Sequence, residues 1–195
     1  ELDRVRFAYP GRPPVLDELR LRVHAGDRLA VTGPNGAGKS TLLRLIVGLA
    51  RPSAGHVVAF GRERSREADF REVRRSVGLV FQDPDDQLFC PTVLEDVAFG
   101  PLNLGQPPAA ARAIAERTLA RLGLDGFAER ITHKLSGGEK RLVSLATVLA
   151  MQPEVLLLDE PSNFLDEATT ARLVTILQGL DQALVVVSHD RHFRR

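Results

Sequence analysis

Cysteine, long apolar runs and an excess of charge of either sign are all scarce in this 195-residue chain. Cys90 is the only cysteine, so no internal disulfide can form and we expect a reducing, cytoplasmic setting. The longest apolar runs, at residues 155–158 and 183–187, fall far short of the ~20 residues that span a bilayer. The 26 basic and 25 acidic residues give a formal net charge of +1, which favours no nucleic-acid partner.

A glycine-rich segment follows an apolar run at residues 29–31 and precedes a helical pattern at 42–48. It consists of Gly33, Pro34, Asn35, Gly36, Ala37, Gly38, Lys39, Ser40 and Thr41. This matches the phosphate-loop pattern G-x-x-x-x-G-K-[ST], and strand, loop and helix stand in the order that the pattern requires. The glycines let backbone N–H groups converge on phosphate at the positive end of a helix. Lys39 supplies a mobile charge and Ser40 a hydroxyl for Mg²⁺, so the segment predicts nucleoside triphosphate binding.

Two acidic residues, Asp159 and Glu160, directly follow the apolar run at 155–158. In phosphate-loop enzymes an aspartate in this place holds Mg²⁺. Glu160 would then lie beside the outer phosphate, where it can orient an attacking water. Alone, the pair could be ordinary acidic residues at a strand end, but a phosphate loop upstream favours the functional interpretation.

A second glycine-containing segment, Ser136, Gly137, Gly138 and Glu139, begins a helical pattern at residues 137–150. Ser136 and Glu139 have the spacing of a capping box, which is sufficient structural reason for both residues. The two glycines nevertheless cost about 1 kcal/mol each in the first turn. Their uncovered N–H groups would suit a second phosphate contact.

The pattern of elements predicts an α/β fold: a P-loop NTPase core with a mostly parallel sheet, an N-terminal antiparallel β subdomain and an inserted helical subdomain. We expect one domain over residues 1–195, with its core at 1–82 and 151–195 and the helical insertion at 83–150. Expected strands lie at 5–9, 19–23, 29–31, 56–60, 77–81, 154–159 and 183–188. Expected helices lie at 42–48, 107–122, 137–150 and 167–178, with another after the capping box at residues 92–95 and a charged, solvated loop and helix at 62–75.

Together these motifs resemble the nucleotide-binding domain of ATP-binding-cassette (ABC) proteins over essentially the whole chain. The phosphate loop resembles Walker A, residues 155–160 Walker B, and residues 135–139 the family signature. Phe81-Gln82 resembles the glutamine loop, Leu165-Asp166 the loop after Walker B, and Ser188-His189-Asp190 the switch histidine. Tyr9 matches the aromatic position that stacks on adenine.

The resemblance implies a mechanism shared by two chains, with ATP and Mg²⁺ as cofactors. ATP would lie between the phosphate loop of one subunit and residues 136–139 (Ser136, Gly137, Gly138 and Glu139) of the other. Glu160, His189 and Gln82 would be the catalytic residues, and Ser40, Gln82 and Asp159 would hold the metal. Hydrolysis would let the dimer open and so drive a partner.

Residues 81–89 and 92–104 resemble the ATPase subunits of energy-coupling-factor importers and of related cobalt and nickel importers. In that family this region faces the membrane subunit. We therefore expect an ATPase that energises uptake of a metal ion or vitamin from the inner face of the cell membrane. Its partners would be a second ABC ATPase subunit, identical or paralogous, and an integral membrane subunit, with no nucleic acid.

Two other functions stay open at this point. A soluble ABC ATPase acting on DNA or ribosomes usually carries coiled-coil insertions or two cassettes, and neither pattern is seen here. A regulatory nucleotide-binding subunit without turnover is the other. It is favoured by Phe164, which is bulkier than the usual small residue, and by the six residues that follow His189.

Overall fold

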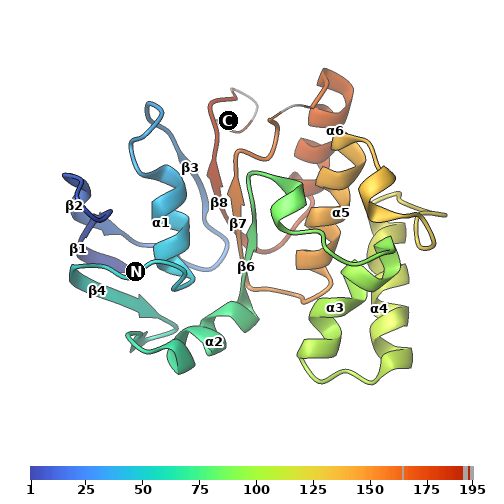
Figure 1. Cartoon of the computed structure of the whole chain (residues 1–195), viewed down its shortest axis with the longest axis horizontal. Coiled ribbons are helices and arrows are strands. Elements are labelled where there is room, and N and C mark those ends of the chain that lie inside the picture. Colours follow the sequence, from blue (N-terminus) through green and yellow to red (C-terminus); the bar gives the residue numbers. More distant parts are fainter. Residues whose placement is uncertain (164, 191–192, 194–195) are drawn as a thin grey trace.

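The computed structural model describes residues 1–163, 165–190 and 193. Its centre is a parallel sheet with strand order β3-β8-β7-β6 (Figure 1). These strands are β3 (Arg28–Val31), β8 (Ala183–Val187), β7 (Val155–Asp159) and β6 (Val77–Val80). β8 is buried throughout and β7 nearly so, which explains their continuous apolar sequences, since a parallel sheet is covered on both faces.

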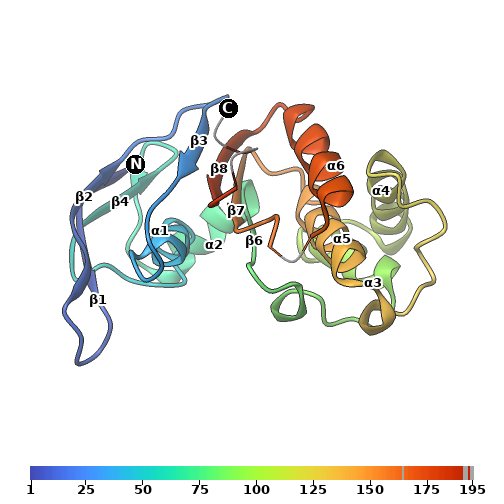
Figure 2. The ribbon, with the colours of Figure 1, turned by 90° about the horizontal axis from the view of Figure 1, so that it is seen from above.

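A second, antiparallel sheet has the strand order β2-β1-β4-β5 and lies across α1 from the parallel sheet (Figure 2). Its strands are β1 (Leu2–Ala8), β2 (Pro14–Leu21), β4 (Ala54–Ala59) and β5 (Arg62–Glu63). The central strand β1 pairs with both β2 and β4. This confirms the expected N-terminal antiparallel structure.

One apolar cluster fills the space between the two sheets. It joins residues of both sheets to α1 (Lys39–Ile46) and α2 (Glu67–Ser76). Leu43 and Leu45 of α1 and Phe70 of α2 are almost wholly buried there. The helix that follows the phosphate loop is therefore fixed on both sides by the core.

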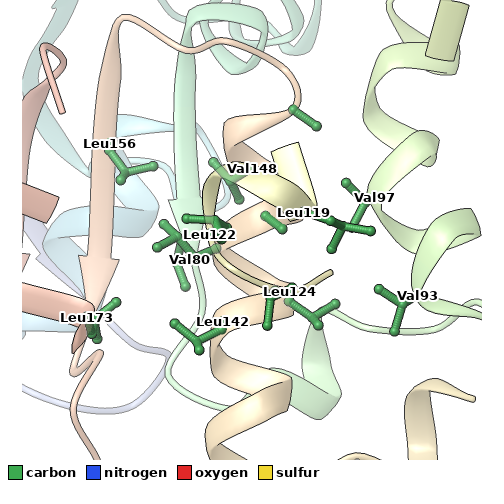
Figure 3. Close-up of a cluster of buried hydrophobic side chains, with 14 of the residues drawn as sticks. Val80, Val93, Val97, Leu119, Leu122, Leu124, Leu142, Val148, Leu156 and Leu173 are labelled. Carbon is green, nitrogen blue, oxygen red and sulfur yellow. The ribbon is translucent and has the colours of Figure 1, made fainter. Parts of the chain in front are cut away.

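The remaining helices pack on the opposite face of the parallel sheet (Figure 2). They are α3 (Val93–Asn103), α4 (Pro108–Arg121), α5 (Gly137–Leu149) and α6 (Glu167–Gln178). Single-turn 3₁₀ helices lie at Pro84–Asp86 and Thr132–Lys134. Figure 3 shows how Leu142 and Val148 of α5 lie between Leu156 of β7 and Val97 of α3. α5 thus links the sheet to the outer helices.

Local capping explains where these helices begin. The Thr92 and Ser136 hydroxyls accept from the backbone N–H groups of Glu95 and Glu139, whose carboxylates accept in return from the backbone N–H of the capping residue. Asp166 accepts from the backbone N–H of Thr169 at 2.7 Å at the start of α6. Each arrangement satisfies donors that a helix start leaves unpaired. The predicted helix starts after Thr92 and Ser136 are therefore confirmed.

Several predicted elements differ from the structure, three of them in instructive ways. The second strand begins at Pro14 instead of residue 19, because β2 is an edge strand, where a missing N–H costs no sheet hydrogen bond. The helix predicted at 42–48 spans Lys39–Ile46, and Gly48 has a left-handed φ of +72° at a place where a Cβ would lie 2.1 Å from Phe70 Cγ. The charged segment at 62–75 is not wholly solvated, since Arg64 and Phe70 are buried.

Some expectations are left open by the fold. No helix within the described ranges is long and apolar enough to cross a membrane. The division into a core and a helical insertion at 83–150 stays a prediction, although α3, α4 and α5 all fall inside that segment. Phe164 lies outside the described residues.

Candidate nucleotide-binding site

The glycine-rich loop joins the end of β3 to the start of α1. Gly38 is the N-cap of α1 and has a left-handed φ of +85°. A Cβ at this position would lie 2.6 Å from Val15 Cγ1, so both the backbone angle and the space require glycine. The next residues, Lys39, Ser40 and Thr41, open the helix. The N-terminus of a helix that is well packed in the core therefore points into the loop, where an anion such as a phosphate group could bind.

Lys39 folds back over this loop. Its Nζ donates to the carbonyl oxygens of Gly33 at 2.9 Å and Pro34 at 3.1 Å, and it lies 3.0 Å from His189 Nε2. With a charged ammonium as donor, Nε2 is the acceptor in this contact. The lysine charge is thereby held between the loop and the segment after β8.

The two acidic residues reach the same place from the end of β7. The parallel register sets Asp159 of β7 opposite Val187 of β8, and Val187 opposite Val31 of β3, so these carboxyl ends lie at one edge. Glu160 has a left-handed φ of +44°, uncommon outside glycine, and its N–H donates to the Val187 carbonyl at 2.8 Å. This strained position directs Glu160 towards the loop after β8.

His189 lies between the lysine and the glutamate. Its Nε2 is 3.4 Å from Glu160 Oε1, and its backbone N–H donates to Glu160 Oε2 at 3.3 Å. Lys39, Glu160 and His189 therefore form one contiguous cluster of a cation, an anion and an imidazole. These residues come from three different elements, and only the sheet topology brings them together.

Asp159 has the environment of a metal ligand. It is 7% exposed, and its Oδ1 has no hydrogen-bond partner among the described residues. Burial raises the pKa of Asp159, opposed by the Ser40 hydroxyl and then by the charges of Arg44, Lys39 and Arg141. A buried carboxylate oxygen without a donor, close to a hydroxyl, suits a hard divalent cation, so Asp159 and Ser40 fit Mg²⁺.

A cavity of about 600 Å³ collects most of the predicted residues. The predicted residues that line it are Tyr9, Asn35, Gly36, Gly38, Lys39, Ser40, Thr41, Gln82, Asp159, Glu160 and His189. Its volume is in the range of small-molecule sites. Gly33 and Pro34 contribute instead the carbonyls that hold Lys39.

Tyr9 stands at the mouth of this cavity and is 37% exposed. Its hydroxyl lies 2.9 Å from Thr41 Oγ1, and its ring meets the Phe7 ring edge-on with centroids 4.9 Å apart. The ring is thus held next to the start of α1 with part of its surface accessible. This leaves the adenine-stacking prediction compatible with the geometry.

Residues 136–139 do not line the same cavity. Gly137 lines an adjacent one of about 460 Å³, which shares Gln82, Asp159 and Asn163 with the first. Glu139 accepts from both Nη atoms of Arg130, at 2.8 and 3.2 Å. Those hydrogen bonds, with the Ser136 backbone N–H, lower the pKa of Glu139 to about 2. The predicted signature segment is accordingly a rigid, charged helix start beside the cavity and outside it.

Sequence reasoning missed several residues of the two cavities. Arg12, Val15, Asn163 and Val187 also line the first. Arg12 and Val15 lie beyond the proline-rich turn after Tyr9, and Asn163 lies between Glu160 and the predicted loop at Leu165-Asp166. Their closeness in sequence to those motifs was the only feature that could have identified them as cavity residues. Arg141, in the second cavity, had no such signal.

A phosphate loop between strand and helix, with acidic residues at the end of an adjacent parallel strand, defines a P-loop nucleoside-triphosphate-binding protein. The ABC transporter family profile matches residues 16–163. The chain belongs to the ABC transporter ATP-binding family, whose members bind ATP and are generally ATPases.

Individual relatives refine this placement. The cobalt import ATP-binding protein CbiO of Rhodobacter capsulatus is 51% identical over 96% of this chain and 69% of its own length. The energy-coupling factor transporter ATP-binding protein EcfA of Methanothermobacter thermautotrophicus is 44% identical over 97% of this chain and 62% of its own. The dimeric cassette MJ0796, solved in a post-hydrolysis state with ADP and Pi, superposes with a TM-score of 0.88 at 28% identity, covering 98% of this chain and 88% of that one.

Proposed function

We propose that this chain hydrolyses ATP to energise a membrane importer of the energy-coupling-factor type, with a cobalt or nickel ion or a vitamin as cargo. The observation that carries the catalytic part is the cluster of Lys39, Glu160 and His189 beside Asp159 in one cavity. The importer part is supported by the similarity to CbiO and EcfA.

In this mechanism the phosphate loop binds the triphosphate through its backbone N–H groups and the start of α1. Lys39 exchanges the Gly33 and Pro34 carbonyls for phosphate oxygens. Glu160 orients the attacking water and accepts its proton, while His189 donates a hydrogen bond to the γ-phosphate. Ser40, Gln82 and Asp159 would hold Mg²⁺, which would neutralise phosphate charge when bound. Catalysis is then positioning and charge stabilisation, without a covalent intermediate.

A second subunit completes each site in this proposal. Gly137 and Gly138 lie at the start of α5, outside the nucleotide cavity of their own chain, so their N–H groups would meet nucleotide bound by a partner, whereas the Ser136 N–H already donates to Glu139. Glu139 stabilises this helix start. The dimeric MJ0796 cassette supports such an assembly. ATP would join two copies, and loss of the γ-phosphate would release them.

A membrane subunit is proposed to dock on the outer helices, which places the chain on the inner face of the cell membrane. Phe89, Phe99 and Leu102 are 66%, 44% and 44% exposed. Phe89 and Phe99 meet edge-on with centroids 4.8 Å apart. Exposed aromatic pairs of this kind are typical of interaction surfaces. They also lie within the segment that resembles the importer ATPases.

The catalytic proposal is tested with Glu160→Gln. We expect the variant to bind ATP with Mg²⁺, to lose steady-state phosphate release by at least about a hundredfold, and to elute as a dimer in ATP. Lys39→Ala is the control that should lose nucleotide binding itself. Steady turnover by the Glu160→Gln variant would count against the mechanism.

The docking proposal is tested with the double variant Phe89→Ser, Phe99→Ser. Its basal ATPase should match the native rate, because neither ring lines the nucleotide cavity. Capture by detergent-solubilised membrane subunits of a cobalt importer should be lost. Capture equal to that of the native protein would refute this surface as the docking site.

A further inference from the structure

Among the described residues, Arg141 is the most deeply buried charged side chain that the proposed mechanism does not use. It lies in the second turn of α5 and is 1% exposed. Burying a guanidinium is costly unless its donors are satisfied and opposite charge is near. Burial lowers the pKa of Arg141, and the carboxylates of Asp83 and Asp159 oppose that change. The cost of this burial suggests that Arg141 has a specific structural or functional role in addition to packing.

The guanidinium donates to two consecutive backbone carbonyls. Nη1 lies 2.6 Å from the Phe81 oxygen and Nη2 lies 2.5 Å from the Gln82 oxygen. These peptides immediately follow β6, and Gln82 lines both the nucleotide cavity and its neighbour. The planar fork of an arginine thus fixes the peptides that carry a predicted metal ligand.

Two further side chains, Lys140 and Gln87, hold the same segment to α5. Lys140 Nζ lies 2.5 Å from Asp85 Oδ1. Gln87 accepts from the Phe81 N–H at 3.1 Å and donates to the Ser144 carbonyl at 2.7 Å. Residues 81–88 are therefore attached to α5 at several points along their length. Since α5 also begins with Ser136–Gly138, the glutamine loop and the signature segment belong to one rigid unit.

We propose that Arg141 is a positioning residue for ATP hydrolysis: it fixes Gln82 relative to α5, so that Gln82 reaches Mg²⁺ in the geometry set by that helix. The proposal rests on the proposed ATPase function. A lysine at 141 keeps the charge but cannot donate to both carbonyls from one plane. The Gln82 peptide would then be free to shift while the phosphate loop and Lys39 stay unchanged.

The test compares Arg141→Lys with native protein in steady-state ATPase assays. We expect kcat to fall about tenfold, since small misplacements of catalytic groups are expensive. The ATP KM should change less than about twofold, and half-maximal activity should need several times more Mg²⁺. Arg172→Lys is the matched control. Arg172 donates to the consecutive carbonyls of Leu122 and Gly123 and lines neither cavity, so its replacement should leave kcat and the Mg²⁺ requirement unchanged.

A double-mutant cycle with Gln82→Ala separates positioning from general destabilisation. If Arg141 acts through the Gln82 side chain, Arg141→Lys should lower kcat by less than about twofold in the Gln82→Ala background. The same tenfold loss in both backgrounds would overturn the proposal, as would a native kcat in the single variant. Should Arg141→Lys not fold, Arg141→Gln, whose side-chain amide cannot donate to both carbonyls in the same geometry, replaces it in the same assays. A native kcat in Arg141→Gln would then overturn the proposal.

Hydrogen exchange distinguishes failure of this proposal from failure of the proposed function. Native protein without any turnover would refute the ATPase function. In that case amide exchange still decides the positioning role: faster exchange confined to residues 81–88 in Arg141→Lys supports it. Exchange at the native rate in that segment overturns it.

Discussion

Replacing Glu139 by glutamine isolates a single charge at the start of α5. Glu139 and Arg130 form a bidentate pair, with Oε1 2.8 Å from Nη1 and Oε2 3.2 Å from Nη2. Glu139 Oε2 also accepts from the Ser136 backbone N–H at 2.8 Å. Glutamine has the same shape and can still accept from Ser136. The variant therefore removes the ion pair while leaving the helix cap largely intact.

The magnitude follows from the pKa of Glu139. The hydrogen bonds from Arg130, and next that from the Ser136 backbone, lower this pKa from 4.5 to about 2. At about 1.36 kcal/mol per pKa unit the shift is worth at most ~3.4 kcal/mol. The side chains of Arg130 and Glu139 are 39% and 30% exposed, so water screens the pair. We therefore expect Glu139→Gln to lower the free energy of unfolding by ~1–2 kcal/mol at neutral pH.

The loss must depend on pH with a definite sign. A carboxyl whose pKa is lower in the folded than in the unfolded chain stabilises the fold above the unfolded value of 4.5. That contribution is lost as the pH falls through the folded pKa of about 2. The stability difference between native and variant should be constant above about pH 5.5 and shrink to about two fifths of that at about pH 3.

Urea unfolding followed by circular dichroism measures both quantities. Glu116→Gln is the matched control: Glu116 lies 2.8 Å from Arg112 one turn away on α4, with both side chains exposed, so its loss should stay below ~0.5 kcal/mol. Equal stability of native and Glu139→Gln at neutral pH would refute the reasoning. A loss that does not change between about pH 7 and about pH 3 would also refute it.

Substitutions at three further positions test the cavity itself. Asp159→Asn should raise the melting temperature at neutral pH without nucleotide. Burial raises the pKa of Asp159 in the folded chain, so this carboxyl lowers the stability of the fold as the pH rises above its unfolded pKa. The variant should also lose Mg²⁺-dependent phosphate release. Gly38→Ala should lower the free energy of unfolding in urea by ~1–3 kcal/mol and weaken ATP binding. The backbone has a φ of +85° there, and the new Cβ would lie 2.6 Å from Val15 Cγ1. A variant as stable as the native protein would contradict this. Tyr9→Phe removes only the hydroxyl contact with Thr41 and should change ATP affinity less than about threefold. Tyr9→Ala also removes the ring and should weaken ATP affinity about tenfold or more. Equal ATP affinities of the native protein and Tyr9→Ala in a fluorescence titration would exclude stacking.

Local chemistry made much of the fold predictable. The boxes at Thr92 and Ser136 gave the starts of α3 and α5, because a cap is decided by residues three positions apart. The predicted helix at 167–178 matches α6, which Asp166 caps. The continuous apolar run at 155–158 gave β7 for a similar reason, since a strand buried on both faces contains no polar position.

Contacts between distant residues were not predictable in this way. Arg141 stands beside Lys140 in a polar stretch that resembles a solvent-facing turn of helix, and only the packing of α5 on the segment after β6 buries it. The strand candidate at 56–60 could have joined either sheet, and its pairing with β1 settles the choice. Likewise, the approach of His189 to Lys39 depends on strand order, which no local pattern encodes.

The candidate site joins residues held by the parallel sheet to residues held by α5. Asp159 ends the buried strand β7, and the phosphate loop follows β3 in the same sheet, whereas Gln82 belongs to a segment tied to α5. Phe89 lies just beyond that segment, at the surface proposed for the membrane subunit. A shift of α5 relative to the sheet would therefore move Gln82 and the Phe89 surface together, while Asp159 stays in place. Binding of the membrane subunit would then affect ATP hydrolysis through the hydrogen bonds of Arg141. Arg141→Lys should therefore weaken the stimulation of ATPase activity by the membrane subunit while the chain stays folded.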